Sequence, residues 1–190
     1  NPATDEVEVV NYSAGTHKGL TAKVQVLNMD ASVAWEKEAT VDSNEDTTDK
    51  CIKLEFPENL SKVHFIKMTL TEDGKVVSDN FYHRSLEENN YQDLCQLAKV
   101  ALQSATTVDK NADGTWSAVS VIENKTSTPA LMIRLNVVDG KDDQQILPVF
   151  YSDNYFSLLP GEKKEVRMSW RDEDTRGNEG KVLITGYNVE

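Results

Sequence analysis

The segment Asp109–Gly114 comes closest to a known ligand-binding pattern. Oxygen-bearing side chains occupy its positions 1, 3 and 5 and a glycine occupies position 6, as in the first half of an EF-hand calcium loop. Such a loop also needs a bidentate glutamate at position 12, but Ser120 stands there, inside a stretch that predicts a strand. We therefore interpret Asp109–Gly114 as a polar turn between two strands, with calcium binding as the alternative.

Histidine serves as a metal ligand and as a general base, so the positions of the three histidines matter. His17, His64 and His83 are far apart, and no two of them stand four residues apart or in one short loop, as zinc ligands usually do. Their spacing leaves a Ser-His-Asp triad open, but the chain has no GxSxG nucleophile elbow. From these patterns we assign no catalytic residue, no cofactor-binding residue and no metal ligand.

The segment Asp153–Glu162 is the least generic of the chain. Its Pro160-Gly161 pair predicts a turn with proline at the second position and glycine at the positive-φ position. We expect the Tyr155 hydroxyl to bond to the backbone, as in a tyrosine corner. The alternative is that Tyr155 and Asp153 contact a ligand from an exposed loop, and we favour the structural role.

Neither the cysteines nor the glycosylation sequons point to a function. Cys51 and Cys95 are too few for a disulfide scaffold and form no CxxC pair, so we expect both to be reduced and structural, with a bridge between them as the alternative. The three sequons begin at Asn11, Asn59 and Asn124, which is about the number that chance provides.

Composition excludes several classes of protein. The chain has 190 residues, a formal net charge of −12 and a pI near 4.7, which excludes a duplex nucleic-acid surface with its clustered Lys and Arg. Hydrophobic residues make up 38% and charged residues 27%, as in a globular protein, and no apolar run approaches the ~20 residues of a membrane-spanning helix. The acidic stretch Asp42–Asp49 has no apolar anchors and predicts a solvated loop. Because the chain begins with Asn1 and has no basic-then-apolar leader, we expect a processed chain or a fragment.

The elements that position these residues are predicted to be β-strands, because apolar and polar residues alternate with a period of two. The pattern covers residues 20–26, 35–41, 52–56, 66–70, 75–77, 116–121, 131–137, 146–151, 166–170 and 182–184. Asp73-Gly74 lies between two such stretches and predicts a hairpin turn. Trp35, Trp116 and Trp170 stand at apolar positions, so we expect all three in a core. Short strands separated by turn residues predict an all-β protein.

An internal similarity divides the chain in two. Val24–Asn28 resembles Val119–Asn124 at an offset of 95 residues, half of the chain length. A period of this length is typical of two related sandwiches of about 100 residues each. We therefore predict two tandem β-sandwiches, residues 1–92 and 93–190, joined through a stretch at 85–97 that holds at most one helical turn.

Two strings of residues in the second half, Pro148–Phe156 and Leu159–Glu162, carry a family resemblance, and a third, Asn80–Ser85, supports it from the middle of the chain. Together they resemble the C-terminal immunoglobulin-like domains of glycoside hydrolase family 2 enzymes of the β-mannosidase and exo-β-glucosaminidase type. The resemblance implies that both sandwiches are immunoglobulin-like and that they are accessory domains beside a catalytic barrel.

The resemblance also implies where the catalytic residues are. In that family two glutamates on a (β/α)8 barrel of about 250 residues act as acid/base and nucleophile. The acid/base glutamate follows an asparagine at the end of a barrel strand, but Asn44-Glu45 and Asn178-Glu179 lie in polar turn sequence. No catalytic residue is therefore carried over. We expect no enzyme activity from this fragment alone, and a parent that is a retaining glycoside hydrolase.

The partners that the resemblance implies are the catalytic and other domains of the same parent chain, with carbohydrate as a second class. It implies a periplasmic or extracellular location. We expect no cofactor and no metal, and the composition already excludes nucleic acid and a membrane span. The alternative hypothesis, from a different functional class, is a free-standing carbohydrate-binding or adhesion module.

Overall fold

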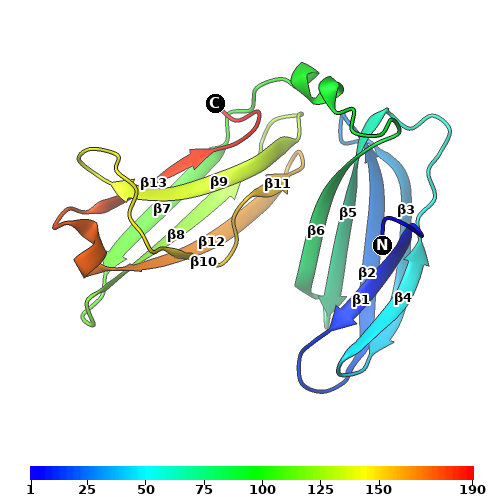
Figure 1. The fold of residues 1–190 in the computed structure, drawn as a ribbon, viewed down its shortest axis with the longest axis horizontal. Helices are drawn as coiled ribbons and strands as arrows, with labels where there is room; N and C mark the ends of the chain where they lie inside the picture. The colour runs from blue at the N-terminus through cyan, green and yellow to red at the C-terminus, as the bar shows by residue number, and fades with distance from the viewer. The chain divides into compact units, whose positions relative to one another are not determined.

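The computed structural model describes all residues from Asn1 to Glu190, and they form two compact units, Asn1–Gln96 and Leu97–Glu190. Each unit consists of two β-sheets, which can be followed in Figure 1. The two sheets of each unit enclose a hydrophobic core of their own. The helical elements are two short 3₁₀ turns, η1 (Gln92–Gln96) and η2 (Asp172–Thr175). None of the helical elements is long and apolar enough to cross a membrane. The prediction of an all-β protein is confirmed.

The first unit has six strands in two antiparallel sheets. They are β1 (Glu6–Asn11), β2 (His17–Asn28), β3 (Val33–Ser43), β4 (Thr47–Lys53), β5 (Val63–Glu72) and β6 (Lys75–Ser85). One sheet pairs β1 with β4, and the other has the order β3-β2-β5-β6. Alternation fixes which side of each strand faces the core: Val24 and Val26 of β2 are buried against Val7 of β1 and Ile52 of β4. Burying each such side chain contributes about 1.5–3 kcal/mol to folding.

The second unit has seven strands in two sheets. They are β7 (Gln103–Lys110), β8 (Thr115–Glu123), β9 (Ala130–Asp139), β10 (Phe150–Tyr151), β11 (Phe156–Leu158), β12 (Lys163–Arg171) and β13 (Gly180–Thr185). The sheet orders are β10-β12-β8-β7 and β11-β9-β13. Ile122, Leu135, Val166 and Trp170 are among the buried residues that fill the space between the sheets.

The segment 146–151 is not the continuous strand that its sequence predicts. The Ile146 N–H bonds to the Val137 carbonyl of β9, whereas Phe150 pairs with Ser169 of β12 in the other sheet. The chain therefore changes sheets within this segment, and Pro148, which has no N–H to donate, lies at the crossing.

The pairing of the strands shows that the strands matched by the internal sequence similarity do not correspond in the structure. That similarity matched β2 with β8, but β2 pairs with β3 and β5, whereas β8 pairs with β7 and β12. By pairing, β1 and β4 correspond to β8 and β12, and β2, β3 and β5 correspond to β9, β11 and β13. The two units share this plan, but no strand of the first unit corresponds to β7.

A buried asparagine marks the end of β1. Asn11 is 6% exposed, and its Oδ1 accepts hydrogen bonds from the Ser13 N–H (2.9 Å) and hydroxyl (2.6 Å). Its Nδ2 donates to the Gly15 carbonyl (3.1 Å) and to the Ser43 carbonyl (3.4 Å) at the end of β3. One side chain thus closes the turn after β1 and fastens it to another strand.

Asn124 does the same after β8. It is fully buried, and its Oδ1 accepts from the Thr126 N–H at 3.1 Å. Its Nδ2 donates to the Thr128 carbonyl (2.8 Å) and to the Leu158 carbonyl (3.0 Å) at the end of β11. Because Leu158 ends β11 as Ser43 ends β3, these contacts match those of Asn11 partner by partner. At both sequons the asparagine side chain therefore holds the following turn in place and ties it to another strand.

The tryptophans differ in burial, so the expectation that all three are in a core is correct in full only for Trp170, which is 2% exposed. Trp116 is half-buried, stacks on Trp170 with ring planes 3° apart, and donates its Nε1–H to Asp172 at 2.7 Å. Trp35 is half-buried beside the core of the first unit.

Candidate functional site

The structure brings a serine, a histidine and a glutamate together in the first unit. The Ser13 hydroxyl lies 3.0 Å from His17 Nε2, and His17 Nδ1 lies 2.8 Å from a Glu72 carboxylate oxygen. Ser13 and His17 stand on either side of the turn after β1, and Glu72 ends β5. These distances match a Ser-His-acid triad, which the spacing of the sequence leaves open.

The direction of proton donation separates this array from a working triad. The Ser13 hydroxyl lies 2.6 Å from Asn11 Oδ1, which can only accept, so its single proton points to the amide. That proton is therefore not given to His17 Nε2, while His17 Nδ1 is hydrogen-bonded to Glu72. A general base has to receive the hydroxyl proton of its nucleophile. The array therefore ties the turn to β5 and does not activate the serine.

The acidic stretch Asp42–Asp49 lies at the end of β3, in a turn and at the start of β4, so the prediction of a loop throughout is wrong. Strand pairing extends to Ser43 and resumes at Thr47. Its carboxylates accept hydrogen bonds from neighbouring backbone: Asp42 from the Gly19 N–H (2.8 Å) and Glu45 from the Gly15 N–H (2.9 Å). These acids fix loops instead of converging on one point.

The segment Asp109–Gly114 forms the end of β7 and the hairpin turn to β8, which confirms its interpretation as a turn. Asp113 accepts from the Thr115 N–H (3.0 Å) and hydroxyl (2.6 Å), and these bonds lower the pKa of the Asp113 carboxyl. Asn111 donates its side-chain Nδ2–H to the Thr115 hydroxyl at 2.9 Å. Two of the three oxygen-bearing side chains of the calcium-like pattern are thus engaged within the turn.

Asn154 is the residue that fixes the segment Asp153–Glu162. Its carboxamide accepts from the Leu135 N–H (2.8 Å) and donates to the Leu135 carbonyl (2.9 Å), so one side chain pairs with β9 as a strand would. Asp153 forms an ion pair with Lys164. The predicted Pro160-Gly161 turn is confirmed: Gly161 has φ +82°, and the N–H of the next residue bonds back across the pair.

The expected role of Tyr155 is wrong. Its side chain is 58% exposed, and the guanidinium of Arg134 lies 5.9 Å from its ring centre. Tyr151, four residues earlier, places its hydroxyl 3.2 Å from the Val137 N–H and accepts from it. Burial of the Tyr151 phenol raises its pKa.

The two thiols lie in different surroundings. Cys51 is half-buried on β4, where its Sγ lies 3.4 Å from the Val7 carbonyl, and burial raises the pKa of this thiol. Cys95 lies exposed in η1, and neither cysteine forms a disulfide.

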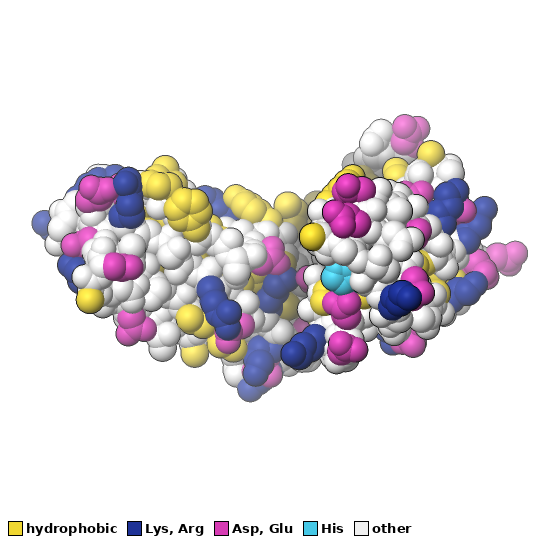
Figure 2. Space-filling model, turned by 90° about the horizontal axis from the view of Figure 1, so that it is seen from below, with side chains coloured by type: hydrophobic (Ala, Val, Ile, Leu, Met, Phe, Trp, Pro, Cys, Tyr) yellow, Lys and Arg dark blue, Asp and Glu magenta, His cyan; other side chains and the backbone are white.

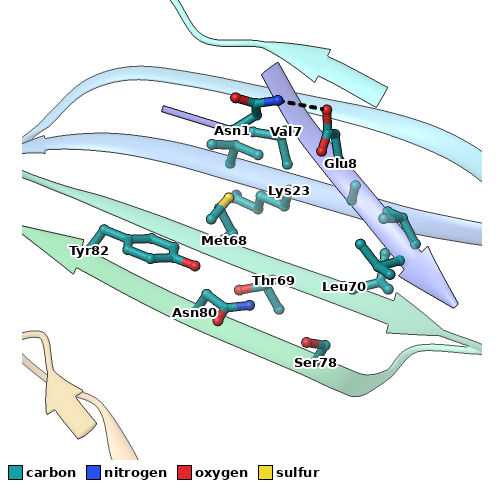
Figure 3. A pocket seen from close by; sticks show the side chains of 14 residues that line it. Asn1, Val7, Glu8, Lys23, Met68, Thr69, Leu70, Ser78, Asn80 and Tyr82 are labelled. Atoms are coloured by element: carbon teal, nitrogen blue, oxygen red, sulfur yellow. Dashed lines mark hydrogen bonds between the residues drawn. The ribbon is translucent and has the colours of Figure 1, made fainter. Parts of the chain in front are cut away.

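A groove of about 390 Å³ lies beside β1 in the first unit. Figure 3 shows β1 crossing above the sheet, with Glu8 on one side of the groove and Tyr82 and Asn80 of β6 on the other. On β5 the floor is formed by the half-buried, apolar Met68 and Leu70, and on β6 it continues with the polar Ser78 and Asn80. A second hollow of about 220 Å³ continues along β1 and ends at the Ser13–His17–Glu72 array.

Surface charge adds no single ligand site. On the face in Figure 2, Lys and Arg side chains are scattered among Asp and Glu instead of gathered in one basic patch. Groups of three or more His, Cys, Asp or Glu side chains in a metal-binding arrangement are absent from the structure, which describes the whole chain. The groove beside β1 is therefore the candidate site.

Two family models match the chain, and they divide it between them. Residues 80–189 match the exo-β-D-glucosaminidase Ig-fold domain, and residues 5–85 match the mannosidase Ig/CBM-like domain. The chain belongs to the exo-β-D-glucosaminidase Ig-fold family. The resemblance stated from the sequence is confirmed, and so is the immunoglobulin-like character of the fold.

Curated relatives of this family are much longer than the chain. It is 30% identical to the exo-β-D-glucosaminidase of Streptomyces avermitilis over 207 residues, which cover 96% of the chain and 23% of the relative. For the exo-β-D-glucosaminidase of Arthroderma benhamiae, the identity is 26% and the coverages are 97% and 22%. The crystal structure of the Amycolatopsis orientalis exo-chitosanase CsxA superposes with a TM-score of 0.90 at 26% identity, over 97% of this chain and 24% of that one.

Proposed function

We propose that these tandem Ig-fold domains are a non-catalytic accessory part of a family 2 glycoside hydrolase that releases β-linked glucosamine. The observation that carries the proposal is the match of nearly the whole chain to 23% of an exo-β-D-glucosaminidase, with more than three quarters of that relative outside the match. In this proposal the other domains of the parent chain are the partners, and the parent acts in the periplasm or outside the cell, where glucosamine polymers occur.

The chemistry of the side chains supports a structural role. Retaining glycosidases need two carboxyl groups about 5–5.5 Å apart, one of them with a raised pKa so that it stays protonated at neutral pH. The carboxyl groups whose pKa departs from its ordinary value here have a lowered one, because they accept hydrogen bonds from lysine or from turn residues. They are Glu6, Asp30, Glu36, Glu87, Asp113, Asp139 and Asp172. None of these carboxylates supplies a proton at neutral pH.

A free-standing carbohydrate-binding module has less support. Sugar sites combine aromatic platforms with converging polar groups. In the groove, Tyr82 is 50% exposed, but the β5 part of the floor, Met68 and Leu70, is apolar and packs against the core of the sandwich. An apolar floor of this kind fits another piece of polypeptide better than a sugar.

Activity measurements test the proposed function. We expect the purified 190-residue chain not to hydrolyse an aryl β-D-glucosaminide or an aryl β-D-mannoside, and the parent protein to hydrolyse the glucosaminide. Removing residues 97–190 from the parent should expose a formerly buried face and lower its melting temperature and its solubility. Turnover by the 190-residue chain that a single Asp or Glu substitution abolishes would refute the accessory role. Ser13→Ala serves as the control for the Ser13–His17–Glu72 array.

A further inference from the structure

We infer that the groove beside β1 is the seat of a further β-strand, formed by the stretch of the parent chain that leads into Asn1. This inference rests on the proposed function only in taking the parent to be longer than these 190 residues. The added strand would run antiparallel to β1 and cover the floor of the groove over β5 and β6.

The edge of β1 next to the groove has no partner strand. β1 belongs to a two-stranded sheet with β4, so only one of its edges is paired. The corresponding strand of the second unit, β8, is paired on both edges, with β12 on one and β7 on the other. An unpaired edge presents a row of N–H and carbonyl groups that another strand can take up.

The turn before β1 already has the hydrogen bonds of a hairpin. The Asn1 nitrogen donates to the Glu6 carbonyl at 2.8 Å, and the Thr4 N–H donates to the Asn1 carbonyl at 3.3 Å. Asp5, the residue before the strand, has a positive φ of 54°. Asn1 is therefore placed as the last residue of a strand that lies antiparallel to β1.

The turn between β7 and β8 has a similar arrangement with one residue fewer. The Asn111 N–H donates to the Thr115 carbonyl at 2.8 Å, and the Gly114 N–H donates to the Asn111 carbonyl at 3.3 Å. Gly114, the residue before the strand, has φ +81°. The turn after Asn111 in the second unit thus resembles the turn after Asn1 in the first in its closing bonds and in the positive φ before the strand, and the strand that leads into Asn111 is β7.

The groove also fits a strand in its shape and chemistry. Because Glu6 receives a bond from Asn1, and successive residues turn their backbone groups to opposite edges, Glu8 and Val10 share that edge with Glu6. A strand on this edge would direct alternate side chains down to Met68 and Leu70 and the others to solvent. This pattern predicts apolar residues at every second position of the added strand.

Hydrogen exchange on extended chains tests the inference. One variant carries seven additional residues before Asn1, alternating Thr and Val, and its matched control has proline in place of each valine. Proline has no N–H and cannot continue a ladder of hydrogen bonds. We expect the amides of β1 to exchange about tenfold or more slowly in the Thr/Val variant than in the unextended chain, and the proline control to exchange like the unextended chain. Amides of β8 serve as the internal reference and should stay unchanged.

Three outcomes would overturn the inference. The first is unchanged exchange in β1, the second is equal protection by the proline control, and the third is a dimer of the unextended chain that the Thr/Val extension does not dissociate. Sedimentation velocity detects such a dimer, and one that the extension does dissociate supports the inference because both compete for the same edge. None of these measurements involves hydrolysis, so a parent without glucosaminidase activity would refute the proposed function and leave this result standing.

Discussion

The two units of this chain have the same plan but differ in how it is closed. In the second unit β7 pairs with β8 and continues the sheet on that side, whereas the corresponding strand of the first unit, β1, borders a groove. Both units keep the buried asparagine after this strand, with its bonds to the same positions of the turn. The asparagine therefore holds the turn in the same way whether or not the neighbouring strand edge is paired with another strand.

The largest expected effect concerns the core that the second unit encloses. Trp170→Ala removes a fully buried indole and should cost about 3–5 kcal/mol of unfolding free energy. Trp116→Ala, on the half-buried partner of the stack, should cost clearly less, because part of its ring already faces water. Urea unfolding of both variants measures the difference, and equal losses would contradict the assigned burial.

Matched substitutions of the two locking asparagines compare the units directly. Asn124→Ala leaves the buried Leu158 carbonyl and the part-buried Thr126 N–H without the Asn124 partner, at a cost of about 2–4 kcal/mol. Asn11→Ala should cost about 1–3 kcal/mol, since Asn11 is 6% exposed whereas Asn124 is fully buried. Hydrogen exchange assigns each loss to its unit. A larger loss for Asn11→Ala would reverse the order that burial predicts.

A fall in pH should lower the stability of the first unit but not that of the second, because all three histidines lie in the first unit. Burial lowers the pKa of His64 and of His83, so the unfolded chain binds protons first as the pH falls. The first unit should therefore lose stability from about pH 6.5, the ordinary value for histidine, down to the lowered pKa values. We expect this loss to be smaller than those above and absent from the second unit. This loss is measured by thermal unfolding at a series of pH values on either side of the ordinary histidine pKa. Hydrogen exchange at the same pH values assigns the loss to one unit.

His64→Phe is the control for the acid effect. His64 Nε2 is buried without a hydrogen-bond partner, and the Phe56 ring packs against the imidazole at 5.6 Å, so an aromatic replacement suits the site. The variant should show a weaker pH dependence than the unaltered chain. An identical dependence would mean that His64 does not contribute.

The smallest expected effect concerns the two tyrosines before β12. Tyr151→Phe removes the acceptor of the Val137 N–H and should cost about 1 kcal/mol. Tyr155→Phe, at an exposed ring, should stay within about 0.5 kcal/mol. Denaturant midpoints of the two variants suffice. A reversed order would restore the role that the sequence suggests for Tyr155.

Sequence predicts most of the strands whose alternation reflects burial on one face, although β1, with Val7 and Val9 buried, is not among those predicted. β2, β9 and β12 are visible in this way because their inward positions are apolar. β7 escapes prediction because it is an edge strand with little burial, and its Ser and Thr residues leave no apolar period to read. β11 escapes it because it has only three residues. A strand shows an alternating apolar pattern in the sequence only where one of its faces is buried in a core.

The candidate site is harder to predict than the fold. Its parts come from β1, β5 and β6, and a groove depends on which edge lacks a partner, which no residue type encodes locally. The pairing of Asn11 and Asn124 has a signal in the sequence, the repeated Asn-x-Ser/Thr pattern, but its frequency alone does not distinguish it from chance. Tyr151 and Tyr155 both stand near the turn, and only the backbone of β9 decides which of them bonds to it.

The Ser13–His17–Glu72 array has a consequence for function assignment by geometric templates. Such templates compare interatomic distances, and here the separations of 3.0 Å and 2.8 Å would pass. The direction of hydrogen-bond donation does not fit a triad, because the Ser13 hydroxyl donates its only proton to the amide oxygen of Asn11. A search that scored the sense of each hydrogen bond as well as its length would reject this false positive without any knowledge of the family.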